Sequence, residues 1–107
     1  MATRITFTAE GKDYCLEYTK RTVKMMEDRG FSPDKILESP MTYLPELFAG
    51  AFLANHRFTK KDVIDALFES MGDRQELVSV LIEMYNEPIK ALTSETEEGN
   101  AIKWTKE

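Results

Sequence analysis

Few residues of this sequence are of a type that could do chemistry, and the most reactive of them stand alone. Cys15 is the only cysteine and His56 the only histidine. A disulfide within the chain, a thiolate metal cage and a histidine metal cluster are therefore all excluded. Cys15 falls in the middle of a predicted strand, with nothing beside it that would activate the thiol. His56 falls at the predicted end of a helix and lacks an activated nucleophile.

Carboxylates are numerous, but helix starts and exposed helix faces account for most of them. The sequence holds no glycine-rich phosphate loop, no His-Glu-x-x-His, no calcium loop and no Gly-x-Ser-x-Gly. We therefore expect a protein that is not an enzyme, with no cofactor and no catalytic, cofactor-binding or metal-binding residues. The carboxylates considered are Glu27, Asp28, Asp62, Asp65, Glu69, Asp73 and Glu76.

Length and composition indicate one domain that buries a core of its own. The chain has 107 residues, of which 42% are hydrophobic and 31% charged. Its net charge of -5 argues against nucleic acid as the main partner, because phosphate binding needs a basic face. No apolar run approaches the roughly 20 residues that span a bilayer, and the N-terminal stretch does not resemble a signal peptide. We expect a cytoplasmic protein that has no membrane partner.

The N-terminal residues predict a β-hairpin over residues 3–18. Apolar and polar residues alternate from residue 3 to residue 9 and again from residue 12 to residue 18, as in paired strands. Glu10-Gly11 fits a two-residue turn between them. That turn pairs Ala9 with Lys12, Phe7 with Tyr14 and Ile5 with Leu16, all on one face, and brings Arg4 near Glu17 on the other.

Helical patterns follow the hairpin. Thr19 is predicted to cap a helix to Arg29, with Val23 and Met26 facing inward and Gly30 in a left-handed C-cap onto which Phe31 folds back. A turn or short helix over residues 32–37 then ends at Ser39-Pro40. The next helix has the most apolar stripe in the chain and runs to Asn55 or His56. We place its cap at Thr42, because a cap at Ser39 would put Pro45 in the second turn.

Two more helices are predicted. The first is capped by Thr59, with Phe58 packing onto Val63 as a hydrophobic staple, and runs to Gly72. The second starts at Asp73, and Pro88 is expected to kink or stop it near residues 85–87. Residues 93–107 are predicted to be a flexible acidic linker and a Trp-bearing tail. The predicted fold is thus mainly α with a short N-terminal β-hairpin (α+β), about four helices in one small domain over residues 1–92, and a flexible C-terminal tail.

Five apolar residues are candidates for binding a partner. Ile102 and Trp104 form an aromatic anchor after the linker, suited to docking as an added strand or in a pocket. The alternatives are that Trp104 folds back on its own domain or lies in a disordered end. Met25, Met71 and Met84 belong to a methionine-rich set that would give an adaptable apolar groove, or else fill gaps in the core.

A set of scattered residues, together with the order of the elements, forms a recognisable pattern over residues 3–85. These residues are Ile5–Phe7, Glu10–Thr19, Val23, Met26–Glu27, Gly30–Phe31, Leu47–Phe48, Ala51–Phe52 and Asn55–His56. The pattern contains no catalytic motif and resembles the small tail assembly chaperones of long-tailed phages and prophages. The resemblance implies a non-enzymatic, mostly helical cytoplasmic protein of the bacterial host cell that binds the tape measure protein and helps to recruit tail tube subunits.

Two other functions stay open at this point. One is a self-associating structural or adaptor domain, in which the ribbon edges or the Trp104 segment pair between copies. The other is a small nucleic-acid-binding regulator, because short successive helices can mimic a helix-turn-helix. The acidic residues Glu69, Asp73, Glu76 and Glu83 would face phosphates and disfavour it.

Overall fold

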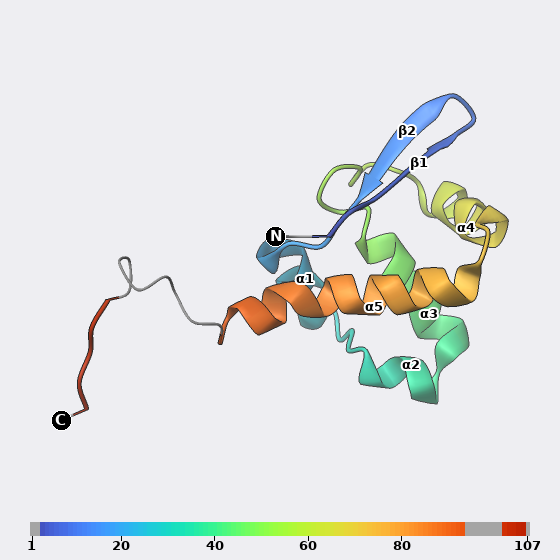
Figure 1. Ribbon diagram of the computed structural model, residues 1–107. Helices are drawn as coiled ribbons and strands as arrows, with labels where there is room; N and C mark the ends of the chain where they lie inside the picture. The colour runs from blue at the N-terminus through green and yellow to red at the C-terminus, as the bar shows by residue number, and fades with distance from the viewer. Residues whose placement is uncertain (1–2, 94–101, 107) are drawn as a thin grey trace.

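The computed structural model describes residues 3–93 and 102–106, and its elements confirm the predicted fold class. The hairpin rises above a group of helices in which α5 lies across α3 (Figure 1). The described residues form five helices where about four were expected, because residues 34–38 fold as a separate short helix. The elements are β1 (Ile5–Ala9), β2 (Lys12–Leu16), α1 (Lys20–Asp28), α2 (Asp34–Glu38), α3 (Pro40–Gly50), α4 (Lys61–Ser70) and α5 (Arg74–Ala91).

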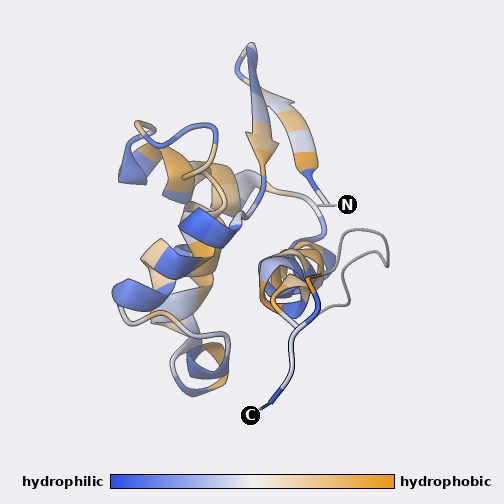
Figure 2. Ribbon diagram, turned by 90° about the vertical axis from the view of Figure 1, so that its left-hand side faces the viewer, coloured by the Kyte–Doolittle hydropathy of each residue, from blue (hydrophilic) through white to orange (hydrophobic). Residues whose placement is uncertain are grey.

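The hairpin has the register that its sequence predicts. Glu10 (φ 50°) and Gly11 (φ 77°) are both left-handed, which matches a two-residue turn whose twist suits the flanking strands. Phe7 stacks on Tyr14 with ring centroids 5.0 Å apart, and the tip stands clear of the helices (Figure 2). The predicted pairs of Ala9 with Lys12, Phe7 with Tyr14 and Ile5 with Leu16 all form, and Arg4 Nε lies 3.0 Å from a Glu17 carboxylate oxygen.

Both ends of helix α1 are capped by the residues from which its ends were predicted. Thr19 and Thr22 form a reciprocal capping box, in which each side-chain oxygen accepts the other residue's backbone N–H. Gly30 has φ 89°, and the Phe31 N–H donates to the Met26 carbonyl at 3.0 Å. Phe31 is buried, as a C-terminal cap of this kind requires.

The start of α3 differs from the prediction. The helix begins at Pro40 rather than after Thr42, so Pro45 lies inside it. Pro40 occupies the first helical position, where a missing N–H costs nothing and the fixed φ suits the helix. The Ser39 carbonyl accepts the N–H groups of Thr42 (3.1 Å) and Tyr43 (3.0 Å), which closes the first turn. Pro45 then costs the helix a single backbone bond.

The end of α3 was also wrongly predicted, since the helix stops at Gly50 and not at Asn55 or His56. Beyond it, the N–H groups of Ala51, Phe52 and Leu53 donate to carbonyls three residues back, so the chain tightens into turns. The Ala51 carbonyl accepts the N–H of Glu17 at 3.2 Å. A continuing helix would have given that carbonyl to Asn55, so contact with β2 accompanies the end of the helix.

The start of α4 lacks the predicted cap and staple. Its N-cap is Lys60 rather than Thr59, without a side-chain hydrogen bond. Phe58 is 85% exposed, and the Arg57 guanidinium lies 4.8 Å from its ring centroid. Val63 is 40% exposed, so no apolar pair forms there. The helix ends at Ser70, two residues before the predicted Gly72.

Helix α5 continues to Ala91, so of the predicted kink or stop near residues 85–87 the stop does not occur. Pro88 lies in the last turn but one, where its missing N–H removes one bond near the helix end. Glu87, the residue before Pro88, is held by a contact with a residue outside the helix. Glu87 accepts both the N–H and the hydroxyl of Thr3, each at 3.0 Å. The end of α5 is thereby held beside the start of the hairpin.

The core lies between α3, α5, α1 and the base of the hairpin. The Tyr18 hydroxyl donates to the Leu47 carbonyl at 2.5 Å, and its ring meets Tyr85 edge-on at 5.5 Å. Among the described residues, the buried Tyr85 hydroxyl has no hydrogen-bond partner. The side chains that are most completely enclosed are Leu16, Leu47, Phe48, Phe52, Leu81, Met84 and Tyr85.

Candidate protein-binding site

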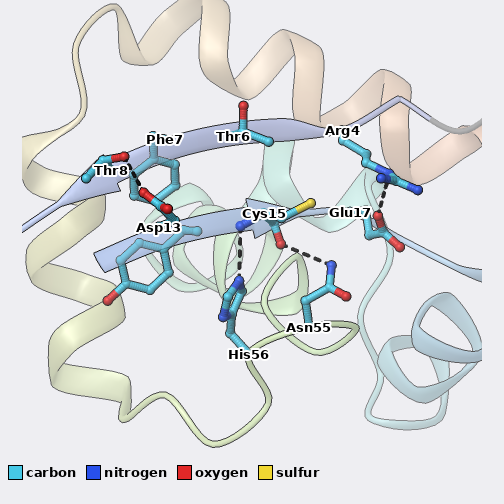
Figure 3. Close-up of a pocket in the computed structure, with 10 residues that line it drawn as sticks. Arg4, Thr6, Phe7, Thr8, Asp13, Cys15, Glu17, Asn55 and His56 are labelled. Atoms are coloured by element: carbon cyan, nitrogen blue, oxygen red, sulfur yellow. Dashed lines mark hydrogen bonds and ion pairs between the residues drawn. The ribbon is translucent and has the colours of Figure 1, made fainter. Parts of the chain in front are cut away.

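Cys15 and His56, 41 positions apart in the sequence, meet at the outer edge of β2 (Figure 3). The Cys15 N–H donates to His56 Nε2 at 3.0 Å, and the Asn55 amide donates to the Cys15 carbonyl at 3.2 Å. The His56 ring packs against Tyr14, with centroids 5.2 Å apart. Because Nε2 accepts a backbone hydrogen bond and the sulfur points away from the ring, this pair is arranged as a structural contact between strand and turn.

The polar face of the hairpin forms an open hollow beside this contact. Its charged and hydroxyl groups engage one another: Arg4 pairs with Glu17, and the Thr8 hydroxyl donates to Asp13 at 2.6 Å. Figure 3 shows both pairs across the two strands. The described residues include no group of three or more His, Cys, Asp or Glu side chains that could hold a metal ion.

An apolar groove on another face is better suited to holding a ligand. It has a volume of about 680 Å³ and is lined by the end of α1, by α3 and the turn after it, and by α4. Ala49, Leu53 and Phe68 line it and are half-buried, and Met41 at its mouth is 91% exposed. The buried side chains beneath them are Met26, Phe31, Phe52 and Ile64. Because α3 and α4 belong to one packed unit, this apolar surface is preformed.

The rim of the groove is charged, with both signs represented. Three basic and three acidic side chains line the groove, all exposed except the half-buried Asp65, so the groove offers ion-pair positions to a ligand of mixed charge. These side chains are Arg29, Glu46, Arg57, Lys61, Asp65 and Glu69.

The predicted partner-binding residues lie elsewhere. Met84 is 1% exposed and belongs to the core of α5, while Met25 on α1 and Met71 after α4 are half-buried. None of the three lines the groove. Ile102 and Trp104 are 89% and 82% exposed. The predicted linker falls mostly on residues 94–101, which lie outside the described part of the chain.

Sequence reasoning missed the groove because its walls come from separate helices. Met41 follows a Ser-Pro pair and carries no periodic signal of its own. Phe68 fits the core stripe of its helix, whereas Leu53 lies off the predicted stripe of the preceding helix; Met26 was correctly expected to face inward. Only the packing of α4 against α3 makes them neighbours.

These elements define a small, mainly helical α+β domain with an N-terminal hairpin. The chain belongs to a family described as a domain of unknown function, DUF5055, whose model matches residues 1–107. No matching curated protein and no matching solved structure was found. Within residues 3–93 and 102–106, none of the helices has the length and apolar character needed to cross a membrane.

Proposed function

We propose that this protein is a non-enzymatic assembly chaperone of a phage or prophage tail, which binds the tape measure protein and helps to recruit tail tube subunits. The observation that carries the proposal is the α3–α4 groove, with its apolar lining and charged rim. The resemblance of residues 3–85 to tail assembly chaperones supplies the identity of the partners.

The groove suits one face of an amphipathic helix. Such a helix presents apolar residues at positions i, i+3, i+4 and i+7, flanked by charged residues of both signs. Met41, Leu53 and Phe68 would contact the apolar face, and the charged rim would meet the flanks. A long helical protein displays many such faces before assembly, and covering them prevents premature association.

The hairpin face supports a binding role over a catalytic one. His56 Nε2, the base that a thiol nucleophile would need, already accepts the Cys15 N–H. An ion pair between Arg4 and Glu17 and a hydrogen bond from Thr8 to Asp13 engage other polar groups nearby.

Co-purification with the tape measure protein encoded in the same prophage tests this proposal. The tape measure protein is tagged and co-expressed with the full chain or with single variants. Met41→Glu and Leu53→Glu each place a carboxylate among apolar contacts. We expect each to weaken binding at least tenfold, about 1.4 kcal/mol.

Leu37→Glu is the matched control. Leu37 is 89% exposed, like Met41, but lies outside the groove. It should bind as the unchanged chain does. Equal loss in Leu37→Glu, or full binding by both groove variants when circular dichroism shows that they are folded, would contradict the groove as the site. Failure of the unchanged chain to bind any tail protein would contradict the proposed function.

A further inference from the structure

The rest of the fold covers one edge of the hairpin and leaves the other edge open. The outer edge of β2 is covered: His56 and Asn55 bind the Cys15 backbone, and the Ala51 carbonyl accepts the Glu17 N–H. No comparable cover lies beside β1 among the described residues, and Figure 2 shows β1 with no element on the side away from β2. One strand edge is thus capped and the other is open.

The backbone groups of Thr6 and Thr8 point into this open space. In a hairpin with a two-residue turn, Ala9 and Lys12 form a hydrogen-bonded pair, and bonded and non-bonded pairs alternate from there. Thr6 and Thr8 therefore face Cys15 and Asp13 in non-bonded pairs. The outward-pointing Cys15 backbone agrees with this alternation. An open edge of this kind is a template for one more strand.

The same chain carries a C-terminal segment whose large apolar side chains are exposed. Residues 102–106 alternate, with Ile102 and Trp104 on one side and Lys103 and Thr105 on the other. Ile102 is 89% exposed and Trp104 82% exposed. This alternation matches β1, where half-buried Ile5 and Phe7 alternate with exposed Thr6 and Thr8. Added beside β1, the segment would place its apolar side chains against the apolar face of the hairpin.

Charge favours the same pairing. Residues 102–106 contain two lysines and no acidic residue, on a chain whose net charge is -5. The polar face of the hairpin carries Asp13, which lies on β2 and accepts the Thr8 hydroxyl of β1. Opposite charges attract the segment toward the hairpin and orient it there.

A second copy is the occupant that the geometry favours. In the folded chain, residues 102–106 lie away from the hairpin, beyond the end of α5 (Figure 1). The Thr3–Glu87 contact holds that end of α5 beside the start of β1. The nine residues after Thr93 span at most about 30 Å. The segment is exposed in the folded chain and is not seated on its own β1 edge, so the edge of a second copy is taken as its partner, and docking on its own edge is the alternative that the test distinguishes.

We propose that residues 102–106 of one copy add as a third strand to the β1 edge of a second copy, and that reciprocal exchange forms a two-fold dimer. Each copy has one open strand edge and one exposed segment. Reciprocal exchange pairs the segment of each copy with the open edge of the other. This dimer involves neither the groove nor its partner, so it can be present or absent independently of the proposed function.

Light scattering of the full chain over a range of concentrations tests the dimer. Thr6→Pro removes the outward N–H without removing a hydrogen bond inside the hairpin, because Thr6 belongs to a non-bonded pair. Ile102→Ser combined with Trp104→Ser removes the apolar side of the added strand. Each is expected to raise the dimer Kd at least tenfold, whereas Thr6→Val keeps the N–H and remains dimeric.

Mixing the two defective variants distinguishes strand exchange from other dimers. The Thr6→Pro chain has an intact segment, and the Ile102→Ser/Trp104→Ser chain has an intact edge. In the mixture, the intact segment of the first variant can add to the intact edge of the second. The mixture should therefore contain a dimer that neither variant forms alone. If Thr6→Pro fails to fold, Lys103→Pro replaces it as a test of the backbone ladder, because the exposed segment supports no part of the domain.

Other outcomes overturn the proposal. A chain that is monomeric at all concentrations excludes exchange, and a monomer whose Trp104 fluorescence is blue-shifted would show docking within one chain instead. Loss of the dimer in Thr6→Pro alone would indicate β1 pairing with β1. Loss in the segment variant alone would indicate that the segments pair with each other.

Discussion

The Cys15 backbone N–H donates to Nε2 of His56 at 3.0 Å, which joins the second strand of the hairpin to the turn that follows α3. The chain's only cysteine and only histidine are therefore neighbours through the backbone of one and the ring of the other. The contact explains why His56 occupies a half-buried position against Tyr14.

Replacing His56 tests the value of this contact. His56→Ala leaves the Cys15 N–H without its acceptor and removes the ring from Tyr14, so we expect a loss of about 1–3 kcal/mol in the free energy of unfolding. Urea denaturation measures it. His56→Gln keeps a side-chain acceptor and should recover part of the loss. Equal stability of His56→Ala and the unchanged chain would contradict a structural role for this bond.

Two buried tyrosines give a matched pair of predictions. Tyr18→Phe removes the donor to the Leu47 carbonyl and should destabilise the fold by about 1–3 kcal/mol. Tyr85→Phe removes a buried hydroxyl without a partner among the described residues, so it should be neutral or stabilise by about 1 kcal/mol. Thermal and urea unfolding of both variants check this. A larger loss in Tyr85→Phe than in Tyr18→Phe would be incompatible with the observed hydrogen bonding.

Alkaline pH should destabilise the fold through the same residues. Burial, followed by the proximity of Tyr85, raises the pKa of Tyr18 well above its usual value; burial and then Glu27 raise the pKa of Tyr85. In the unfolded chain the tyrosine hydroxyls ionise at about pH 10, whereas in the folded protein Tyr18 and Tyr85 keep their protons at that pH. The unfolded state then binds fewer protons, so stability is retained below that pH and falls as pH rises through the folded pKa.

Unfolding free energies measured below and above about pH 10 check this slope. The Tyr18→Phe/Tyr85→Phe double variant controls for lysines and other groups that titrate in the same range. Its stability should fall less steeply with pH. Parallel pH profiles for the double variant and the unchanged chain would refute the assignment to these tyrosines.

Close packing at Gly50 leads to a further prediction. A Cβ at this position would overlap Sδ and Cε of Met26, which is buried beneath the groove. Gly50→Ala should therefore cost about 1–3 kcal/mol, despite the better helix propensity of alanine. Gly72→Ala is the control, because nothing lies within 4 Å of its added Cβ. In a Met26→Ala background the cost of Gly50→Ala should shrink, and an unchanged cost in that double-mutant cycle would contradict the clash.

Local patterns predicted the elements whose determinants are close in sequence. Alternation and a two-residue turn determined the hairpin register, and Thr19 and Gly30 marked the ends of α1 to within one residue. In each case the contacts join residues within one short stretch of the chain, from Thr19–Thr22 to Ile5–Leu16, so the pattern contains the contact that forms.

The errors fall where distant residues decide the structure. The end of α3 coincides with a contact to β2, and the Cys15–His56 pair joins positions 41 apart. The groove required the relative placement of α3 and α4. The start of α3 is a different case: the local cost of Pro45 was overestimated relative to the benefit of Pro40 at the first position.

The bond from the Glu17 amide to the Ala51 carbonyl couples two elements that are separate in the sequence. We expect the turn that follows α3 and the hairpin to stabilise each other through this bond, so the two should open together during native-state fluctuations. Amide hydrogen exchange would then give Glu17 and His56 the same opening free energy, and loosening the hairpin would shorten the protection of both.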